Sequence, residues 1–530
     1  RVPPILEEVD QVSMALIEEC LMRMPASAAT QARWFRHKLT GASSCRLLDL
    51  SEPLPGSGDP PAALAIVRFD GAGNYLIPVT LGCRNSDTEG RVLAGCGVLS
   101  GDVKAGDSDM VLIDAAADPA YVNAVLALME SNGDVQARNG VFEFRRIGSY
   151  RGWSVETVSN AYTNSVVIAH RSSALKTFRV LTAGINPDVE IGSALTQRTQ
   201  FVEMARVLGE GAYVGRDGVR YSVAVQTEAI PNVGDVWAVM GAALDCLRRD
   251  GAPSIGRLPI SPGCSDLCSS DAIGRLGATI GRLHLALASI DLPGFGRAPV
   301  TPATLRGWRV RLADRAAGAV GRLDDALRRP GFLGDDALRL AGRVMEAWPG
   351  LESSLTSEAW ESDAADASLG GFGELIRCHG DLHLGQVLLR PDGRFAVIDF
   401  EGEPLAPLPE RRSLANPARD VAGMLRSFSY AAHSARLRAV SSGLHEYDLL
   451  LDWERLARLW FLQGYFREVD GAGDGLWPAS QEARQWLISL FEIEKAFYEV
   501  DYEINNRPDW AVIPLSGILQ VLKRWGGGRA

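Results

Sequence analysis

The sequence predicts an α+β fold in two lobes with an additional subdomain at the N-terminus. Three observations lead to this prediction: strand-like runs concentrate in residues 141–230, helical periodicity dominates residues 231–530, and residues 1–140 mix short elements of both kinds. We therefore expect an N-terminal cap subdomain over 1–140, a strand-rich lobe with its hinge over 141–230 and a helical lobe over 231–530.

The cap subdomain contains a breaker-rich linker, residues 51–61, and a predicted hairpin. The runs 63–69 and 75–81 are β-prone and flank the turn residues Gly71-Ala-Gly-Asn. No cluster of titratable side chains in this part of the sequence suggests chemistry, so we interpret it as a cap or an interaction module.

The strand-rich lobe is expected to hold two neighbouring strands and then a helix. Residues 164–169 and 173–181 are β-prone, and a helix is expected to begin at Asn186-Pro187, because proline fits the first helical turn. The lobe ends in the run 221–232, in which Pro231 is a strand breaker. We expect the hinge near residues 226–229 of this run.

The helical lobe is interrupted by an acidic, glycine-rich loop at 357–373 and by the run 394–400. Glycines punctuate the apolar helix predicted over 276–287, which indicates close packing against another helix. His284 in this helix is expected to be a core histidine with satisfied hydrogen bonds.

Charge and composition exclude several classes of protein. The net charge of −11 leaves no basic stripe for a phosphate backbone, so no nucleic acid partner is expected. No uncharged apolar run approaches the roughly 20 residues that span a bilayer, and the acidic start lacks a signal-peptide core, which indicates no membrane association. Eight scattered cysteines indicate reduced thiols in a cytoplasmic protein, and Cys264 and Cys268 are interpreted as incidental.

The segment Cys378-His-Gly-Asp-Leu-His-Leu-Gly-Gln, followed by Phe395-Ala-Val-Ile-Asp-Phe-Glu-Gly, carries the chemistry. Gln386 follows Asp381 by five residues, and Asp399 follows Asp381 by 18. Phosphoryl transfer needs a carboxylate that accepts the proton of the attacking hydroxyl, and an amide and a second carboxylate that hold Mg²⁺ on ATP. Protein kinases have the same spacing, with Asn where this chain has Gln386 and Asp-Phe-Gly where it has Asp-Phe-Glu. The spacing and the order of the lobes predict a protein-kinase-like phosphotransferase.

Two histidines lie in the same segment. A metal pair of His379 and His383 is disfavoured because Mg²⁺ prefers oxygen ligands. His379 is expected to brace the loop, and the role of His383 stays open at this point.

Lys176 lies in an alternating strand whose other face is apolar, and only five of the 54 basic residues are lysines. A lysine there must reach water or meet anions. Glu190 on the following helix is expected to pair with it and to aim its ammonium at the nucleotide phosphates. An edge lysine that faces solvent is the alternative.

No glycine-rich phosphate loop precedes this strand. Thr163, Asn164 and Ser165 could cap the phosphates instead, although a plain hairpin turn is equally consistent with them. At the hinge, Gln226, Thr227 and Glu228 are the candidates for adenine binding.

The chain resembles bacterial maltokinases, which are relatives of the aminoglycoside phosphotransferases, and the C-terminal part of trehalose synthase–maltokinase fusions. The segments that carry the resemblance are Gln31-Ala-Arg-Trp-Phe, Pro187-Asp-Val-Glu, Pro231-Asn-Val-Gly-Asp-Val-Trp, His379-Gly-Asp-Leu-His-Leu-Gly-Gln, Asp399-Phe-Glu-Gly-Glu-Pro, Ala418-Arg-Asp-Val-Ala-Gly-Met-Leu-Arg-Ser-Phe and Asn506-Arg-Pro-Asp-Trp. Leu382 departs from the family pattern, which usually has an aromatic residue there. Arg36-His37-Lys38 stands where small, glycine-containing sequences are common.

The resemblance implies an aminoglycoside phosphotransferase-like fold and a kinase that converts maltose and ATP to maltose 1-phosphate and ADP. It implies Asp381 as the base, Gln386 and Asp399 as Mg²⁺ ligands and Lys176 as the phosphate clamp. It also implies association or fusion with a trehalose synthase. The candidate substrate residues are His383, Glu401, Arg419, Tyr498, Glu499, Tyr502 and Asn506.

Alternatives remain open at this point. The stripe from Tyr498 to Asn506 recurs at helical spacing and could equally be half-buried helix packing, and Arg419 could form an ion pair with Asp420. The acceptor could instead be glucosamine or an aminoglycoside. A non-catalytic, pseudokinase-like scaffold for a trehalose synthase is the alternative from another class. Such a scaffold would be expected to lack catalytic residues, whereas this sequence has Asp381, Gln386, Asp399 and Lys176.

Overall fold

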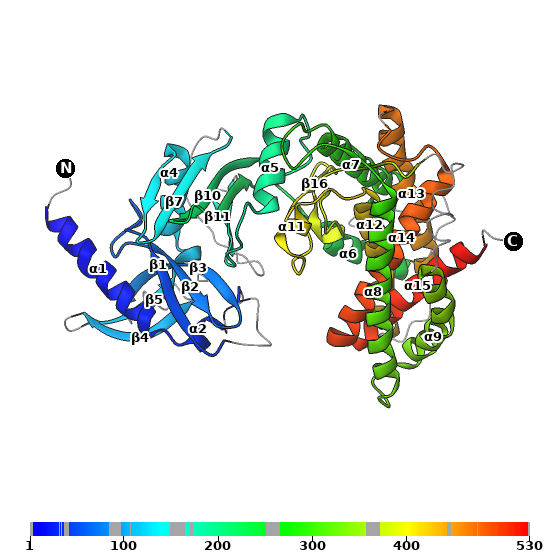
Figure 1. Cartoon of the computed structure of the whole chain (residues 1–530), viewed down its shortest axis with the longest axis horizontal. Coiled ribbons are helices and arrows are strands. Elements are labelled where there is room, and N and C mark those ends of the chain that lie inside the picture. Colours follow the sequence, from blue (N-terminus) through cyan, green and yellow to red (C-terminus); the bar gives the residue numbers. More distant parts are fainter. Residues whose placement is uncertain are drawn as a thin grey trace. The chain divides into compact units, whose positions relative to one another are not determined.

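The structure is a computed structural model, and it forms two compact units, Arg1–Pro231 and Asn232–Ala530 (Figure 1). The residues that it describes are 4–30, 32, 34–35, 42–83, 97–105, 108–148, 165–169, 173–250, 266–356, 371–441, 447–473 and 475–527. The division between the units falls next to the expected end of the strand-rich lobe.

A five-stranded antiparallel sheet forms the first part of the first unit. Its strands, in spatial order, are β1 (Cys45–Leu50), β2 (Ala63–Phe69), β3 (Gly73–Cys83), β5 (Ser108–Asp114) and β4 (Val98–Ala105). Strands β2 and β3 are the predicted hairpin, with Phe69 paired to Gly73 at the turn. Helices α1 (Pro4–Arg23) and α2 (Ala26–Thr30) precede the sheet. The aromatic rings of Phe35, Phe69 and Tyr75 pack together in its core.

A six-stranded antiparallel sheet forms the second part of this unit. Its strands, in spatial order, are β6 (Asp134–Gln136), β7 (Gly140–Arg146), β10 (Val207–Gly215), β11 (Arg220–Glu228), β9 (Ser173–Thr177) and β8 (Ser165–Ala169). The expected boundary between residues 140 and 141 falls inside β7, which pairs with β6 on the other side of the boundary. Helix α4 (Pro119–Ser131) contacts β7 and β10.

Helix α5 (Pro187–Arg198) begins where proline predicted it. Asn186 is its N-cap and accepts a hydrogen bond from the backbone N–H of Asp188 through its side chain. This cap satisfies one of the N–H groups that every helix leaves unpaired at its start. The helix contacts β10 and β11, and β11 carries the candidate hinge residues Gln226, Thr227 and Glu228.

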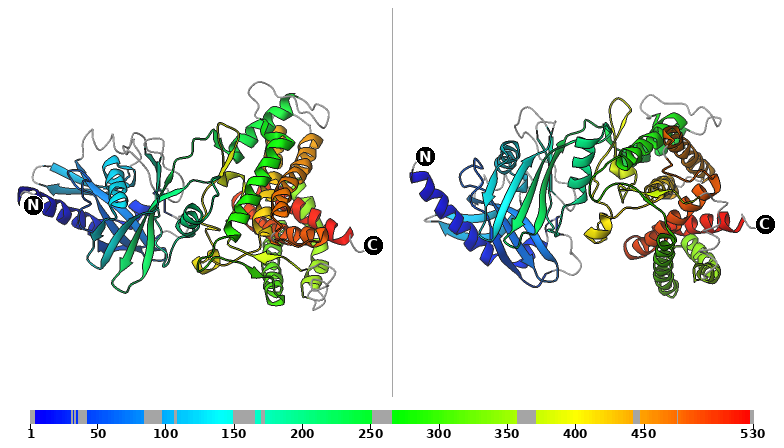
Figure 2. Two further views of the ribbon diagram at one scale, coloured as in Figure 1. Left: turned by 90° about the horizontal axis from the view of Figure 1, so that it is seen from above. Right: turned by 45° about the horizontal axis from the view of Figure 1, so that its top comes forward.

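The second unit is built mainly from long helices (Figure 2). They are α6 (Val236–Asp250), α7 (Ser270–Ala288), α8 (Pro302–Leu327), α9 (Asp335–Thr356), α12 (Ala418–Ser441), α13 (Tyr447–Ala472), α14 (Gln481–Asn506) and α15 (Val512–Gly527). Helix α14 packs against α8, α12 and α15. No described helix combines the length and the apolar character that crossing a bilayer requires.

Short strands and a short helix complete this unit. The short elements are β12 (Gly234–Asp235), β13 (Ala298–Pro299), β14 (Glu374–Leu375), β15 (Val387–Leu389), β16 (Phe395–Val397) and α11 (Leu408–Arg411). Strands β15 and β16 form a hairpin in which Val387 pairs with Val397. Asp381 lies in the loop before this hairpin, and Asp399 follows it closely.

Helices α7 and α13 pack closely, as the glycine pattern predicted. A Cβ added to Gly277 would lie 2.1 Å from the backbone oxygen of Phe461, and one added to Gly464 would lie 1.9 Å from that of Gly274. Only glycine permits this approach of the two backbones. His284 on α7 is fully buried, as expected, and its Nδ1 lies 2.7 Å from the hydroxyl of Tyr465.

Candidate active site

The loop that contains Asp381 is held by a buried carboxylate. Asp420, in the first turn of α12, accepts hydrogen bonds from the backbone N–H groups of His379 (2.8 Å) and Gly380 (2.9 Å). It also lies 3.1 Å from Nε2 of His284. Burial alone would raise the pKa of Asp420, but the hydrogen bond and charge of His284 and the loop N–H groups outweigh burial and lower it. The sequence suggested Asp420 only as a partner of Arg419.

His379 braces the loop, as expected. Its Nε2–H donates to the backbone oxygen of Ile398 across 3.0 Å. Its ring lies against Phe400, with 5.1 Å between ring centroids. This histidine therefore connects the loop around Asp381 with the segment around Asp399.

Gln386 and Asp399 are brought together by the β15–β16 hairpin. The backbone N–H of Ile398 donates to the backbone oxygen of Gln386 (3.0 Å). The side-chain Nε2 of Gln386 donates to Oδ2 of Asp399 (3.0 Å). Asp399 has φ of 66°, and among the described residues Asn132 is the other non-glycine residue with positive φ. This conformation costs energy and is common at functional sites. The pair offers the amide and carboxylate oxygens that Mg²⁺ prefers.

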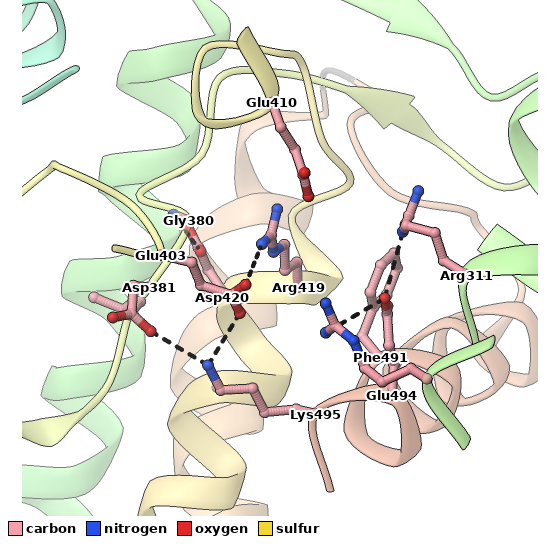
Figure 3. A pocket seen from close by; sticks show the side chains of 13 residues that line it. Arg311, Gly380, Asp381, Glu403, Glu410, Arg419, Asp420, Phe491, Glu494 and Lys495 are labelled. Carbon is pink, nitrogen blue, oxygen red and sulfur yellow. Dashed lines mark hydrogen bonds and ion pairs between the residues drawn. The ribbon is translucent and has the colours of Figure 1, made fainter. Parts of the chain in front are cut away.

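Asp381 faces a pocket within the second unit (Figure 3). The pocket is formed by α8, α11, α12, α14 and the loops before β15 and after β16. Its lining residues are Arg311, Arg315, Gly380, Asp381, Leu382, Glu403, Glu410, Arg419, Asp420, Gly423, Phe491, Glu494 and Lys495. A pocket that holds a carboxylate beside paired charges suits a small polar molecule better than an apolar one.

Ion pairs connect the charged side chains of this pocket. Nζ of Lys495 lies 3.3 Å from Oδ1 of Asp381 and 3.2 Å from Oε1 of Glu403. Arg419 lies 3.4 Å from the other oxygen of Glu403. Burial alone would raise the pKa of Glu403, but the positive charges of Lys495 and Arg419 outweigh burial and lower it.

Sequence reasoning did not assign Lys495 or Glu403 to the site. The one signal for Lys495 was the scarcity of lysine, five among 54 basic residues. The same scarcity drew attention to Lys176 but was not used for Lys495 on α14.

Three predicted substrate residues lie on the loops and helix near Asp381. Arg419 lines the pocket and pairs with Glu403 instead of Asp420. Nδ1 of His383 accepts a hydrogen bond from the backbone N–H of Gly385, and burial lowers the pKa of His383. Glu401 is partly buried, and its backbone oxygen accepts a hydrogen bond from Arg411.

The four predicted substrate residues on α14 are not among the residues that line the pocket. Tyr498 lies nearest, with Nζ of Lys495 5.1 Å from its ring centroid. Glu499 is buried and forms an ion pair with Arg426 on α12 (2.6 Å). Tyr502 is exposed, and Asn506 donates a hydrogen bond to its backbone oxygen.

Lys176 lies on β9 in the first unit, with its side chain 16% exposed. Its Nζ donates to Oδ2 of Asp188 across 2.8 Å. Asp188 is two residues before the predicted partner Glu190 and shares the first turn of α5 with it. Sequence reasoning did not name Asp188.

The other nucleotide candidates lie in the same unit. Nε2 of Gln226 donates to the hydroxyl of Ser173 (2.8 Å), while Thr227 and Glu228 are partly buried at the end of β11. Thr163 and Asn164 lie outside the described residues. Ser165 is the first residue of β8.

Residues 268–459 match the protein-family model described as "Phosphotransferase enzyme family". The matched range contains the loop around Asp381, the β15–β16 hairpin and α12. It ends before α14, so the helix that carries Lys495 lies outside the match.

Two curated relatives are named glucosamine kinase. The one from Streptacidiphilus jiangxiensis is 33% identical over 240 residues, which are 45% of this chain and 47% of the relative. The one from Mycolicibacterium smegmatis is 29% identical over 246 residues, 46% of this chain and 52% of the relative. The chain thus spans about half the length of the curated relatives that it matches.

A solved structure titled "Glucosamine kinase in complex with glucosamine, ADP and inorganic phosphate" resembles the whole fold. The TM-score is 0.61 at 21% identity, over 95% of this chain and 99% of the other. A second structure of a glucosamine kinase gives the same TM-score at 20% identity, over 96% and 99%. The α+β, bilobal protein-kinase-like fold is therefore confirmed. For residues 268–459, the family match agrees with the expected enzyme class, a phosphotransferase.

Proposed function

We propose that this protein is an ATP- and Mg²⁺-dependent sugar kinase and that an amino sugar of the glucosamine class is its acceptor. The observation that carries the proposal is the position of Asp381, which lines a small, strongly charged pocket in the same unit as the Gln386–Asp399 pair. A base, a pair of metal ligands and a polar pocket are the parts that phosphoryl transfer to a hydroxyl needs.

In the proposed reaction, Asp381 accepts the proton of the acceptor hydroxyl. The hydroxyl oxygen forms a bond to the γ-phosphorus of ATP, the bond from that phosphorus to the bridging oxygen breaks, and ADP leaves. Gln386 and Asp399 would hold Mg²⁺, which neutralises charge on the phosphates. Lys176 would contribute its ammonium to the same phosphates.

Carboxylates in the pocket support an acceptor with an ammonium group. Glu403, Glu410 and Glu494 line it (Figure 3). Glu403 is already paired with Lys495 and Arg419, and Glu494 with Arg311 and Arg315. Glu410 from α11 is therefore the carboxylate that we expect to meet the ammonium group first. Carboxylates bind ammonium groups through charge-assisted hydrogen bonds, which a neutral sugar makes more weakly. The curated relatives named glucosamine kinase support the same choice.

Maltose is the second candidate acceptor. The resemblance to maltokinases in segments such as Asn506-Arg-Pro-Asp-Trp favours it. A trehalose synthase as partner belongs to this alternative, because it would supply or consume the disaccharide.

An acceptor panel tests the proposal. The purified protein is assayed for ADP release with ATP, Mg²⁺ and glucosamine, N-acetylglucosamine, maltose, trehalose or an aminoglycoside, and the phosphorylated product is identified by mass spectrometry. We expect kcat/KM for glucosamine to exceed that for N-acetylglucosamine, which lacks the ammonium, by at least about tenfold. Transfer to maltose alone would overturn the amino-sugar assignment.

The variant Asp381→Asn tests whether the measured transfer depends on the proposed base. We expect it to lose about 10²- to 10⁴-fold in kcat, the usual contribution of general base catalysis, while ATP affinity changes little. If the protein phosphorylates none of the acceptors and its nucleotide binding does not depend on Mg²⁺, the results would favour the scaffold instead of a kinase.

A further inference from the structure

Lys495 is the cation that contacts the proposed base. It lies in the middle of α14, 114 residues from Asp381 in sequence, and its Nζ donates to Oδ1 of Asp381. The same nitrogen donates to Oε1 of Glu403, 92 residues away. Figure 3 shows the ammonium between the two carboxylates, with all three side chains directed into the pocket.

The surroundings of Lys495 fix its position. Its side chain is 25% exposed, and its ammonium lies over the ring of Tyr498. A largely buried ammonium is costly unless carboxylates and hydrogen bonds compensate it. Glu403 is held on its other side by Arg419, so the three groups Arg419, Glu403 and Lys495 form a chain of alternating charge that ends at Asp381.

The second oxygen of Asp381 stays available. Within the part of the chain that the structure describes, Oδ1 accepts from Lys495, and no donor is found for Oδ2. A carboxylate whose one oxygen is held by a cation keeps a fixed rotamer, while its other oxygen can meet a hydroxyl.

We propose that Lys495 is a positioning residue of the reaction: it fixes the orientation and the negative charge of Asp381, so that Oδ2 receives the acceptor proton. This inference rests on the proposed function of Asp381 as the base. It assigns a role to a residue of α14, which lies outside the segment matched to the phosphotransferase family.

The charged and titratable groups around Lys495 come from six elements, and they include His383 from the loop around Asp381 and Glu410 from α11. The others are Asp381 from the same loop, Glu403 from the loop after β16, Arg419 and Asp420 from α12, Arg311 and Arg315 from α8, and Glu494, Tyr498 and Glu499 from α14 itself. Removing Lys495 leaves Asp381 and Glu403 facing each other with Arg419 as the nearest remaining cation. Asp381 would then bind a proton more readily.

The test compares Lys495→Met, Lys495→Arg and the control Lys523→Met, which removes an exposed lysine from α15. We expect Lys495→Met to lower kcat/KM by at least about 10²-fold. We also expect it to move the acid limb of the pH profile of kcat/KM up by about one pH unit or more. Lys495→Arg should bring the acid limb back toward that of the wild type, since it restores the charge. A folded Lys495→Met with an unmoved acid limb would overturn the proposal.

Glu403→Gln should shift the acid limb in the opposite direction. It removes the carboxylate that shares the ammonium with Asp381, so the acid limb should move to lower pH, whatever happens to kcat. A shift in the same direction as that of Lys495→Met, or no shift, would contradict the arrangement. This variant also keeps the proposal testable if Lys495→Met fails to fold.

An activity-independent measurement separates this proposal from the proposed function. The melting temperatures of wild type and Lys495→Met are compared between about pH 8 and about pH 5 without substrates. In the variant, protonation of Asp381 or Glu403 relieves their repulsion, so the difference in Tm should shrink as pH falls. A constant difference would mean that Lys495 only fills space. A kinase assay with no active acceptor would instead reject the proposed function and leave this result standing.

Discussion

Oδ2 of Asp420 accepts a hydrogen bond from the backbone N–H of His379 across 2.8 Å, two residues before the proposed base. The other oxygen of Asp420 takes the N–H of Gly380. The carboxylate therefore fixes the backbone of the loop, while Lys495 holds the side chain of Asp381 from the other direction. Pre-organisation of this kind lets a base act without reorganising during the reaction.

Asp420→Asn should destabilise the protein by about 3 kcal/mol. The amide has one acceptor oxygen, so at least one of the buried loop N–H groups, or the ring of His284, loses its partner. Urea unfolding measures the loss, and Asp452→Asn on the exposed face of α13 is the matched control. Equal stability of the two variants would contradict the role of Asp420.

The contribution of Asp420 should also depend on pH in a defined direction. Its pKa in the folded protein is below the ordinary value of 3.8. The stabilisation is therefore fully present above about pH 4 and is lost as pH falls further. The stability difference between wild type and Asp420→Asn should be smaller at about pH 3.5 than at about pH 6, as measured by urea unfolding at both values.

Gly423→Ala should disturb the base without touching it. A Cβ at this position on α12 would lie 2.4 Å from the backbone oxygen of Leu382, which follows Asp381. The loop must move, so we expect a loss of about 1–3 kcal/mol in stability and a lower kcat. Gly342→Ala on α9, where a Cβ meets nothing within 4 Å, should instead be more stable by about 0.5–1 kcal/mol. A Gly423→Ala enzyme with wild-type kcat would argue against this tight fit.

Local patterns account for what the sequence predicted correctly. The β2–β3 hairpin and the start of α5 follow from turn residues and a proline within a few positions. Asp381, Gln386 and Asp399 were recognisable because their spacing lies within one segment. By contrast, the expected boundary at residue 140 divides β7, because the pairing of β6 with β7 was not visible in composition.

Contacts between helices that are far apart in the sequence could not be predicted from it. Lys495 meets Asp381 only because α14 packs against α8 and α12, which no local pattern specifies. The stripe from Tyr498 to Asn506 on α14 was recognised, but the same spacing is consistent with substrate binding and with helix packing. Packing decides that Lys495 faces the pocket and that Glu499 faces Arg426.

Glu499→Gln separates a structural from a substrate-binding role. Oε2 of Glu499 accepts two hydrogen bonds from the guanidinium of Arg426, at 2.6 and 2.9 Å, in a buried pair. Removing the charge leaves the guanidinium less compensated, so we expect a loss of about 3 kcal/mol in stability. The KM for the acceptor should change less than about twofold. A large rise in KM with unchanged unfolding would support the sugar-binding role instead.

Lys176→Met should raise the KM for ATP. Lys176 is the one lysine on the strands of the six-stranded sheet, and Asp188 holds its ammonium at 2.8 Å within the described part of the first unit. A hydrogen bond to a charged group contributes about 1.5–3 kcal/mol, so the loss of the phosphate contact should raise KM roughly tenfold or more. Steady-state kinetics with varied ATP at saturating acceptor measure the change, and Lys523→Met is the control with an equal change in charge. Asp188→Asn should raise the KM for ATP by a smaller factor, because it leaves the ammonium in place and removes only the carboxylate that orients it. An unchanged KM in Lys176→Met would mean that the ammonium does not contact the nucleotide, and the ion pair with Asp188 would then be purely structural.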